Sequence, residues 1–367
     1  MANTETVIHL AQQFFGEQEK FLVKQGELTA SLFRFSSGVC GLRLANAKGQ
    51  LVVLPFQGQQ VWSDEFGGRN LTMKSMFTEP QPTRDFLATF GSFLSHCGAT
   101  AMGVPGANDT HPLHGELPNA PYREVFISFG DDERGHYMGV SGKYQHTVAF
   151  NYNYVAQPLL KLYAGSSLFH LSMTITNLKN SPMELMYLAH INFRPVDNGR
   201  LVYSAIPSPE HMRVRANLPS FIQLRPGYKE FVEELRLHPE KHQVLAPGLV
   251  FDPEMVFSID YLADEQGWAH ALQIHPDQTA DYVRHHPAQL SKGNRWICRT
   301  ADQDALGFEP ATAEVDGYTS EKAKGNLQVI QPHGEFYCEI EIGVLDPAAA
   351  RRVEENVARL VSLHRTD

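Results

Sequence analysis

The sequence predicts an all-β protein, a sandwich or barrel formed by a single domain over residues 1–367. Many short segments are rich in β-branched and aromatic residues, and turn-forming residues separate them. In residues 168–178 and 183–193, apolar side chains alternate with more polar ones at the two-residue period of a strand. The sequence has no internal repeat or linker, so we expect a strand-rich core over residues 20–345 with a few peripheral helices.

The predicted strands follow one another along most of the chain. They lie at residues 31–35, 39–44, 50–56, 125–129, 144–154, 168–178, 183–193, 255–262, 268–274, 295–300, 326–330 and 336–344. Helices are expected within residues 5–20, which have an apolar face at helical spacing, and near residues 228–235.

A further helix is expected at the C-terminus, over residues 346–367. Asp346 is a good N-cap residue, and Pro347 suits the first helical position. Val357 and Leu360 belong to an apolar stripe at helical spacing. We therefore expect this helix to pack on the outside of a sheet.

Composition and charge narrow the possible partners. The formal net charge of -10 argues against nucleic acid and anionic membranes, because both require a basic surface. No apolar run reaches the roughly 18 residues of a membrane helix, and the N-terminus does not resemble a signal peptide. The four cysteines are widely separated, as is typical of free thiols in a reducing compartment. We expect a cytoplasmic protein, monomeric or homodimeric, that binds a small neutral molecule.

The segment from His111 to Tyr122 concentrates groups that can do chemistry. Two histidines, a glutamate and an asparagine stand among three prolines, which exclude a continuous helix. Functional residues are common on rigid polar loops. His114 is therefore a candidate ligand-contacting residue, although a surface histidine has the same signature. His111, His114 and Glu116 could also hold a catalytic metal, but their spacing matches metalloenzyme motifs only loosely.

Two polar residues, His190 and Asn192, project from one face of the predicted strand at residues 183–193. Since the strand is otherwise largely apolar, these groups need hydrogen-bonding partners, either a ligand or neighbouring loops. Asp252 precedes another predicted strand and could accept hydrogen bonds from hydroxyl groups. An Asp-Pro turn is the alternative interpretation of Asp252.

Glu309 is a candidate base because it stands between Phe308 and Pro310. A carboxylate buried in such surroundings is poorly solvated, so its pKa rises and it becomes a better base near neutral pH. An exposed loop glutamate is the alternative interpretation. The sequence has no P-loop, dinucleotide-binding, nucleophile-elbow or HExxH motif, which excludes several enzyme classes.

In their order along the chain, these residues resemble the motifs of the aldose 1-epimerase (galactose mutarotase) superfamily. The matching motifs are Leu113-His114-Gly115, His190-x-Asn192, Asp252 with Met255-Val256, Gly307-Phe308-Glu309, and a final strand after Pro332-His333-Gly334-Glu335. The resemblance spans residues 20–345. It is closer to an uncharacterised branch of the superfamily, whose members carry a similar loop with a downstream asparagine. Here that residue is Asn119, which we expect to contact the substrate.

The resemblance implies a β-supersandwich fold and an interconversion of sugar anomers that needs no cofactor. Glu309 would remove the proton from the anomeric hydroxyl, and His190 would protonate the ring oxygen, opening the sugar to its free aldehyde. Rotation about the C1–C2 bond and closure in reverse order would give the other anomer. His114 would hydrogen-bond near the ring oxygen, while Asp252 and Asn192 would hold hydroxyl groups.

Two departures from the superfamily pattern affect the expected substrate contacts. The superfamily usually has an arginine ahead of the Leu-His-Gly loop, and the corresponding stretch, residues 91–98, has none. We expect Arg69, Lys74 or His96 to replace it. The aspartate motif normally reads Asp-His-Asn, whereas here Asp252 is followed by Pro and Glu. Both departures spare the acid–base pair but make a larger or acidic sugar derivative possible as substrate.

Two other functions fit the same residues. The chain could be a carbohydrate-binding protein without turnover, or a metal-dependent sugar isomerase that uses His111, His114 and Glu116. The first predicts sugar binding with no acceleration over the buffer rate. The second predicts a bound metal and sensitivity to chelators.

Overall fold

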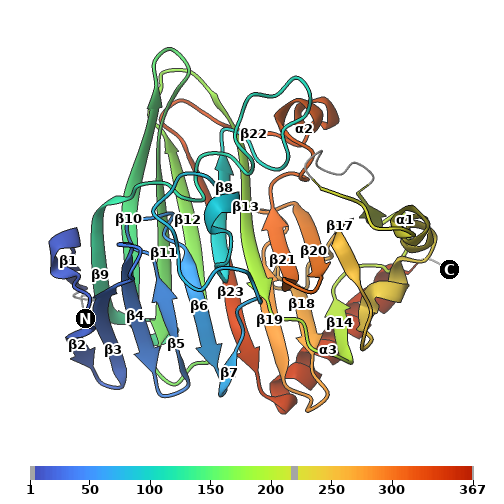
Figure 1. Cartoon of the computed structure of the whole chain (residues 1–367), viewed down its shortest axis with the longest axis horizontal. Helices are drawn as coiled ribbons and strands as arrows, with labels where there is room; N and C mark the ends of the chain where they lie inside the picture. Colours follow the sequence, from blue (N-terminus) through green and yellow to red (C-terminus); the bar gives the residue numbers. More distant parts are fainter. Residues whose placement is uncertain (1–4, 216–221, 366–367) are drawn as a thin grey trace.

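The structure is a computed structural model that describes residues 5–215 and 222–365. Two large antiparallel β-sheets pack against each other, and the helices lie at their periphery (Figure 1). The predicted all-β fold with a few peripheral helices is confirmed.

Sheet A has ten strands, each antiparallel to its neighbours. In spatial order they are β1 (Thr6–His9), β9 (Arg123–Asp132), β10 (Gly135–Val148), β11 (Tyr152–Tyr163), β12 (Leu168–Asn177), β23 (Glu335–Leu345), β19 (Ala280–His285), β18 (Ala269–Ile274), β14 (Gly199–Tyr203) and β16 (Val244–Leu245).

Sheet B has thirteen strands. Its main path runs β15 (Met212–Val214), β17 (Phe251–Ile259), β20 (Lys292–Arg299), β21 (Asp304–Ala311), β13 (Met183–Phe193), β8 (Leu94–Ala99), β6 (Val61–Phe66), β5 (Gly49–Val53), β4 (Cys40–Asn46), β3 (Leu28–Arg34) and β2 (Lys20–Gln25). Two short strands complete it: β7 (Arg69–Asn70) pairs with β6, and β22 (Gln328–Ile330) pairs with β13.

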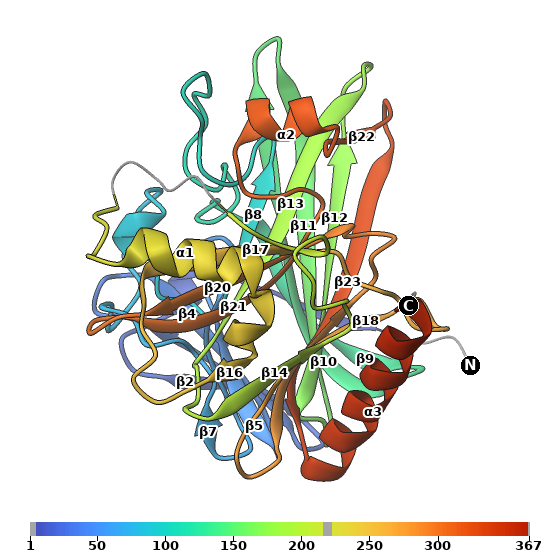
Figure 2. The same ribbon diagram turned by 90° about the vertical axis from the view of Figure 1, so that its right-hand side faces the viewer.

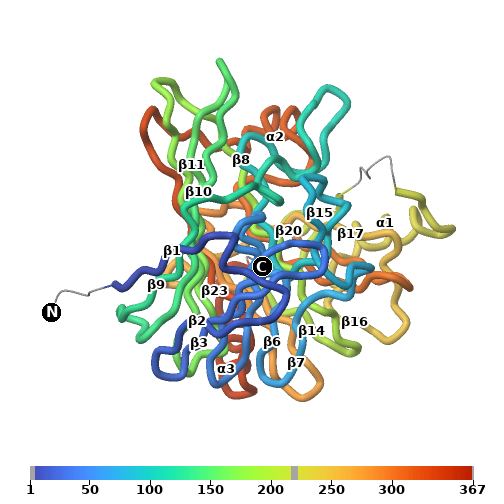
Figure 3. Tube along the Cα trace, turned by 60° about the vertical axis from the view of Figure 1, so that its left-hand side comes forward, coloured from blue at the N-terminus to red at the C-terminus, as the bar shows by residue number. Residues whose placement is uncertain are grey.

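The main hydrophobic core lies between the two sheets. Phe93, next to β8 of sheet B, packs on Phe169 of β12 in sheet A, with ring centroids 6.4 Å apart. Tyr187 of β13 packs on Phe336 of β23 at 5.9 Å. In Figure 3, β10 and β11 of sheet A lie toward one side of the molecule and β17 and β20 of sheet B toward the other. Because side chains alternate along a strand, each sheet also has an outer face that can carry loops, helices or a site.

The C-terminal helix α3 (Pro347–His364) covers the outer face of sheet A (Figure 2). The side chain of Asp346 accepts a hydrogen bond from the backbone N–H of Ala349 at 2.8 Å, which caps the helix. Ala350 of the helix packs among Leu272 and Tyr282 of sheet A. The predicted helix, its N-cap and its packing on a sheet are confirmed.

The remaining helices are short. The helix predicted near residues 228–235 is confirmed as α1 (Tyr228–Leu237), whereas α2 (Tyr318–Lys324) is not predicted because its seven residues hold too little pattern. Three 3-10 turns are η1 (Gln12–Phe14), η2 (Leu87–Thr89) and η3 (Pro239–Gln243). In the described ranges, no helix has the length and apolar composition needed to cross a membrane.

The helix predicted within residues 5–20 is wrong. The segment instead forms strand β1, which pairs with β9, and then the turn η1. Val7 and Phe14, which belong to the supposed apolar face, are 41% and 48% exposed. Pairing along the edge of sheet A satisfies the backbone of β1, and this long-range gain outweighs a weak local helix preference.

Candidate active site

The candidate site lies on the outer face of sheet B. Four neighbouring strands, β17, β20, β21 and β13, contribute Glu254, Trp296, Glu309 and His190 respectively. Phe308, next to Glu309 in the chain, points the other way into the core between the sheets, as strand alternation requires. Strand pairing therefore brings these four residues together, although His190 and Glu309 are 119 positions apart in the sequence.

These side chains form the floor of a pocket of about 90 Å³. Loop residues close it from above: Phe86 and Leu87 come from the segment before β8, and Val104 and His114 from the segment after it. Arg215, which directly follows β15, closes a further side. The pocket is thus built from a rigid sheet floor and a roof of loops, a common construction for small-molecule sites.

Aromatic rings surround the imidazole of His190. Ring centroids of Phe90, His114 and Trp296 lie 5.2, 5.3 and 5.5 Å from that of His190. The Phe90 and Trp296 rings also contact each other at 5.5 Å. Walls of this kind exclude water and suit the C–H-rich face of a sugar ring.

Glu309 and His190 are in direct contact. Ile191 pairs with Phe308 in the β13–β21 ladder, so the preceding and following residues stand side by side. One carboxyl oxygen of Glu309, Oε1, lies 3.3 Å from Nδ1 of His190, and the two side chains are 3% and 6% exposed. The residues expected to act as base and acid therefore share one buried position.

Asn192 sets the orientation of the His190 ring. Its Nδ2 donates to the backbone carbonyl of Ser92 at 3.0 Å, which leaves Oδ1 to accept the Nδ1–H of His190 at 2.7 Å. With the proton on Nδ1, the lone pair of the neutral ring lies on Nε2, where a ligand can use it. Asn192 is fully buried and does not line the pocket. Asn192 therefore contacts and supports His190. From the sequence we had expected it to hold substrate hydroxyls.

Burial shifts the pKa values of both groups. Desolvation raises the pKa of Glu309 to about 8; the nearby charge of Glu254 raises it further and that of Arg215 lowers it. Desolvation lowers the pKa of His190 to about 4, partly offset by the hydrogen bond to Asn192. Between these two values Glu309 is protonated and His190 is neutral, so the pair carries no charge; a ligand that moves the Glu309 proton to Nε2 of His190 converts it into a carboxylate and an imidazolium.

Gly307 leaves room for the Glu309 side chain. The two residues lie on the same face of β21, and a Cβ atom at position 307 would stand 2.5 Å from Oε1 of Glu309. It would also stand 3.0 Å from Cβ of Trp296. The glycine of the Gly-Phe-Glu motif therefore has a steric reason: the carboxyl group folds back over it.

His114 reaches the pocket through an unusual backbone conformation. Its φ of 59° lies in the left-handed region, and its N–H donates to the carbonyl of Gly103 at 3.0 Å. The next residue must be glycine, because a Cβ at Gly115 would stand 2.2 Å from the carbonyl oxygen of Ala101. Burial holds the pKa of His114 well below its usual value, and its Nδ1 is buried without a partner in the described part of the chain. A neutral imidazole thus faces His190 with hydrogen-bonding capacity to spare.

Two charged residues of the pocket are not predicted from the sequence. Glu254 accepts a hydrogen bond from the indole N–H of Trp296 at 2.7 Å and forms an ion pair with Arg215. The Arg215 side chain is 10% exposed, and its Nε has no partner among the described residues. The pocket therefore contains an arginine and a second carboxylate beside the Glu309–His190 pair.

Asp252, which we expected to bind hydroxyls, does not line the pocket. The register of β17 against β20 shifts between Phe251 and Met255, so this stretch bulges away from a regular strand. The backbone carbonyl of Asp252 accepts a hydrogen bond from Arg225 at 2.9 Å. Glu254, two residues later, occupies the pocket instead.

The upstream cations expected to replace the missing arginine lie elsewhere. Arg69 forms an ion pair with Asp281 of sheet A, at 3.3 Å. Lys74 donates to the backbone carbonyl of Ala301 at 2.9 Å. Neither lines the pocket. Arg215 is the arginine that does, and it lies downstream of the Leu-His-Gly loop instead of ahead of it.

His96 and Asn119 are also away from the pocket floor. His96 of β8 faces the core side of sheet B, where its Nδ1 lies 2.7 Å from the hydroxyl of Tyr187. The side-chain oxygen of Asn119 accepts hydrogen bonds from Gln57 and Gln60 at 3.1 and 2.8 Å. Asn119 thus braces a loop at the rim of an adjoining cleft.

The three residues of the metal hypothesis serve separate purposes. The carboxylate of Glu116 accepts hydrogen bonds from the backbone of Thr100 at 3.0 Å and from the hydroxyl of Tyr154 at 2.5 Å. Nδ1 of His111 lies 2.8 Å from the carbonyl of Pro112. His111, His114 and Glu116 do not form a cluster of metal-ligand spacing within residues 5–215 and 222–365.

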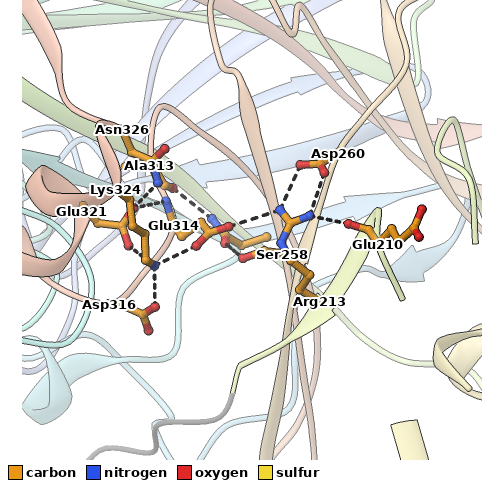
Figure 4. A network of polar contacts seen from close by, with 11 residues as sticks. Glu210, Arg213, Ser258, Asp260, Ala313, Glu314, Asp316, Glu321, Lys324 and Asn326 are labelled. Atoms are coloured by element: carbon orange, nitrogen blue, oxygen red, sulfur yellow. Dashed lines mark hydrogen bonds and ion pairs between the residues drawn. The ribbon is translucent and has the colours of Figure 1, made fainter. Parts of the chain in front are cut away.

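One carboxylate cluster of metal-ligand spacing does occur in the described chain, at Glu314, Asp316 and Glu321. The ammonium group of Lys324 lies among all three, at 2.8, 2.6 and 2.7 Å (Figure 4). Arg213 also reaches Glu314 at 3.3 Å. Lys324 thus contacts all three carboxylates and, with Arg213, offsets part of their charge, which ties α2 to the sheet.

The raised pKa of Glu309 makes a prediction about stability. The folded state keeps its proton up to a pH of about 8, whereas the unfolded chain loses it near the ordinary value of 4.5. The stabilisation is present at low pH and is lost as pH rises through this window, by up to about 1.4 kcal/mol per pH unit. We expect Glu309→Gln, which cannot ionise, to gain stability relative to the natural chain between pH 6 and 8.

Urea unfolding at several pH values measures this difference. Glu355→Gln on the exposed face of α3 is the matched control and should follow the natural chain. Parallel stability curves for the natural chain and Glu309→Gln would contradict the raised pKa.

Comparison with solved structures places the fold among the galactose mutarotase-like proteins. A protein from Klebsiella pneumoniae named "putative aldose 1-epimerase" is similar over 98% of this chain and 96% of its own, with a TM-score of 0.80 and 20% identity. A protein of the same name from Escherichia coli K12 covers 83% of this chain and 98% of its own, with a TM-score of 0.55 and 14% identity. A galactose mutarotase-like protein from Clostridium acetobutylicum covers 88% of this chain and 100% of its own, with a TM-score of 0.58 and 13% identity. The predicted β-supersandwich fold is confirmed.

Sequence comparisons identify the family. Curated proteins give no significant match. The model of the family described as "Domain of unknown function (DUF4432)" matches residues 36–344, a range that includes every strand contributing to the pocket floor. The chain therefore belongs to this family of unknown function, which here has a galactose mutarotase-like fold.

Proposed function

We propose that the protein interconverts the anomers of a sugar, with Glu309 as the base and His190 as the acid. The observation that carries this proposal is the contact between these two buried groups on the floor of an aromatic-walled pocket. The chemistry needs one group that can accept a proton and one that can donate it, on neighbouring oxygens of one ring. The fold of the solved relatives supports the same reaction class.

In the proposed reaction, the sugar lies against Phe90 and Trp296 with its anomeric carbon at the pocket floor. When the sugar binds, the proton held by Glu309 passes to Nε2 of His190. The Glu309 carboxylate then takes the proton of the anomeric hydroxyl while Nε2 of His190 delivers its proton to the ring oxygen. The C1–O5 bond breaks, C1 becomes an aldehyde, and closure on its other face restores both protons. No electron leaves or enters, so the cycle needs no redox partner.

The remaining pocket residues would hold the ring in place. His114 is neutral and offers an imidazole nitrogen near His190. Glu254 and Arg215 take the role that Asp252 and an upstream arginine were expected to play. Because Trp296 and Arg215 already hold its oxygens, the Glu254 carboxylate is oriented before substrate arrives. Such preorganisation reduces the cost of fixing a flexible ring.

Glu309→Gln tests the base directly. The amide keeps the shape of the carboxyl group but cannot take a proton, so kcat for anomer interconversion should fall by at least about a thousandfold. Exchange NMR on a panel of aldoses measures the rate, and calorimetry should find sugar binding largely retained. Glu355→Gln serves as the control.

The outcomes separate the candidate functions. Unchanged rates in Glu309→Gln would reject the assignment of the base. Sugar binding by the natural chain with no acceleration over the buffer rate would instead favour a carbohydrate-binding protein.

The pH dependence of kcat/KM tests the shared proton. The reaction requires a pair that holds one proton, which is the state between the pKa of His190 at about 4 and that of Glu309 at about 8. We expect kcat/KM to be level from pH 5 to 7 and to decline above pH 8, where Glu309 loses the proton that it must pass to His190. A rate that keeps rising through pH 9 would contradict the scheme.

Asn192→Ala tests the positioning of His190. Without the Oδ1 acceptor the ring can turn or change tautomer, so kcat should fall about ten- to a hundredfold with a smaller change in KM. The pKa of His190 should also fall, because the hydrogen bond to Asn192 raises it. Nitrogen-15 NMR of the imidazole reports both the tautomer and the titration. A variant with altered kcat but an unchanged His190 spectrum would show that Asn192 acts in another way.

A further inference from the structure

A larger cavity adjoins the candidate pocket. This outer cleft has a volume of about 910 Å³ and is lined by residues 84–87, 104–107 and parts of 112–119, together with Arg215, Asp316 and Ser320. It shares Phe86, Leu87, Val104, Leu113 and Arg215 with the inner pocket. The two cavities therefore adjoin each other, and Glu309 and His190 line the inner one.

We propose that the outer cleft is a binding subsite for further sugar units, so that the ligand is a neutral oligosaccharide held by its reducing end. The proposal deepens the proposed function and rests on it for the orientation of the ligand. Only the terminal unit of a reducing oligosaccharide has a free anomeric hydroxyl. That unit must enter the inner pocket, and the other sugar units of the oligosaccharide must lie in the outer cleft.

The sizes of the two cavities support a ligand longer than one ring. The inner pocket has about 90 Å³ and holds the acid–base pair, whereas the outer cleft has about 910 Å³ and lacks it. A single ring placed with its anomeric carbon at Glu309 would leave most of the outer cleft filled with water. Its remaining hydroxyls would point toward that space, and a glycosidic bond replaces one such hydroxyl.

The walls of the outer cleft are held in place by other parts of the chain. The guanidinium of Arg84 donates to the backbone carbonyls of Asn119 and Glu116 at 2.6 and 2.9 Å. Asp316, which also lines the cleft, is fixed by Lys324 at 2.6 Å. Charged hydrogen bonds therefore brace two separate parts of the cleft lining.

The charge of the outer cleft favours a neutral ligand. Its charged lining residues are Arg84, Arg215, Asp85, Glu116 and Asp316. Two cations stand against three carboxylates, and Arg215 is further neutralised by Glu254. A phosphate or carboxylate on the ligand would find no excess positive charge, whereas hydroxyl groups can use both donors and acceptors. This distribution of charge argues against an acidic sugar derivative as the ligand, which the sequence left possible.

Calorimetry on the inactive Glu309→Gln protein tests the subsite without turnover. The probes are glucose, maltose, cellobiose, lactose and maltotriose, which share a glucose reducing end, together with galactose, galactobiose, xylose and xylobiose. Glucose 6-phosphate and glucuronic acid are the charged comparisons. We expect at least one neutral oligosaccharide to bind ten times more tightly than its own reducing-end monosaccharide. Equal affinities throughout, or tighter binding of a charged monosaccharide, would overturn the proposal.

Blocking the outer cleft provides the second arm. Ser320→Trp on α2 and Ala107→Trp in the neighbouring loop each place bulk at a position that lines the cleft. Each should lower the ratio of oligosaccharide to monosaccharide affinity at least fivefold. Two variants are used so that the test still stands if one of them misfolds. Ser362→Trp, at an exposed position of α3, is the matched control and should leave the ratio unchanged. A ratio unaffected by both cleft variants would place the ligand elsewhere.

The two proposals fail in different ways. Anomer interconversion by the natural chain with no preference for longer sugars would reject the subsite alone. A preference for longer sugars in binding, with no acceleration of anomer exchange, would reject the catalytic role of Glu309 and His190 alone.

Discussion

The structure depends on keeping a carboxyl group and an imidazole side by side without water. An ionised carboxylate removed from water costs several kcal/mol unless its charge is compensated. Glu309 avoids most of this cost by keeping a proton, with a pKa raised to about 8, while His190 stays neutral. The pair is therefore stable as an uncharged unit, yet it can become a charged one when a ligand moves the proton.

The sheet makes this arrangement possible because it fixes both groups without any long side chain having to search for its partner. Adjacent strands put Glu309 and His190 in contact through the backbone register alone. A Cβ atom at position 307 would push the Glu309 carboxyl group away, and glycine leaves that space free. Asn192 then selects the tautomer of the ring. Each of these effects is local and adds little conformational free energy, because the backbone hydrogen bonds of sheet B already determine the positions.

The roof of the site is held by different means. His114 stands in the left-handed region, which a histidine adopts only under constraint. Glu116 supplies that constraint: its carboxylate accepts hydrogen bonds from Ala99, Thr100 and Tyr154, and so ties the loop to both sheets. A residue considered as a metal ligand from the sequence is thus an anchor in the structure. Polar side chains of this loop hydrogen-bond to neighbouring segments: Glu116 to Ala99 and Thr100, and Asn119 to Gln57 and Gln60.

The sequence predicts well what depends on local pattern and poorly what depends on irregularity. Alternation in β13 places His190 and Asn192 on one face, and the apolar neighbours of Glu309 correctly indicate burial. It does not reveal that Asn192 turns toward His190, nor that a register shift in β17 brings Glu254 to the pocket in place of Asp252. Arg215 is missed for a related reason. It follows a three-residue strand at the edge of sheet B, and only the assembled sheet brings it near Glu309.

The arginine and the second carboxylate give the site a charge balance that bears on its ligand. Glu254 raises the pKa of Glu309 and Arg215 lowers it, so the two partly cancel at the Glu309 carboxyl. An anionic ligand would add a negative charge beside Glu309 and would draw Arg215 away from Glu254. Both changes would raise the pKa of Glu309 further and make it harder for the proposed base to release the proton that it holds at rest. A neutral ligand leaves the balance intact, so under the proposed function the electrostatics that set the pKa of Glu309 would also favour an uncharged substrate.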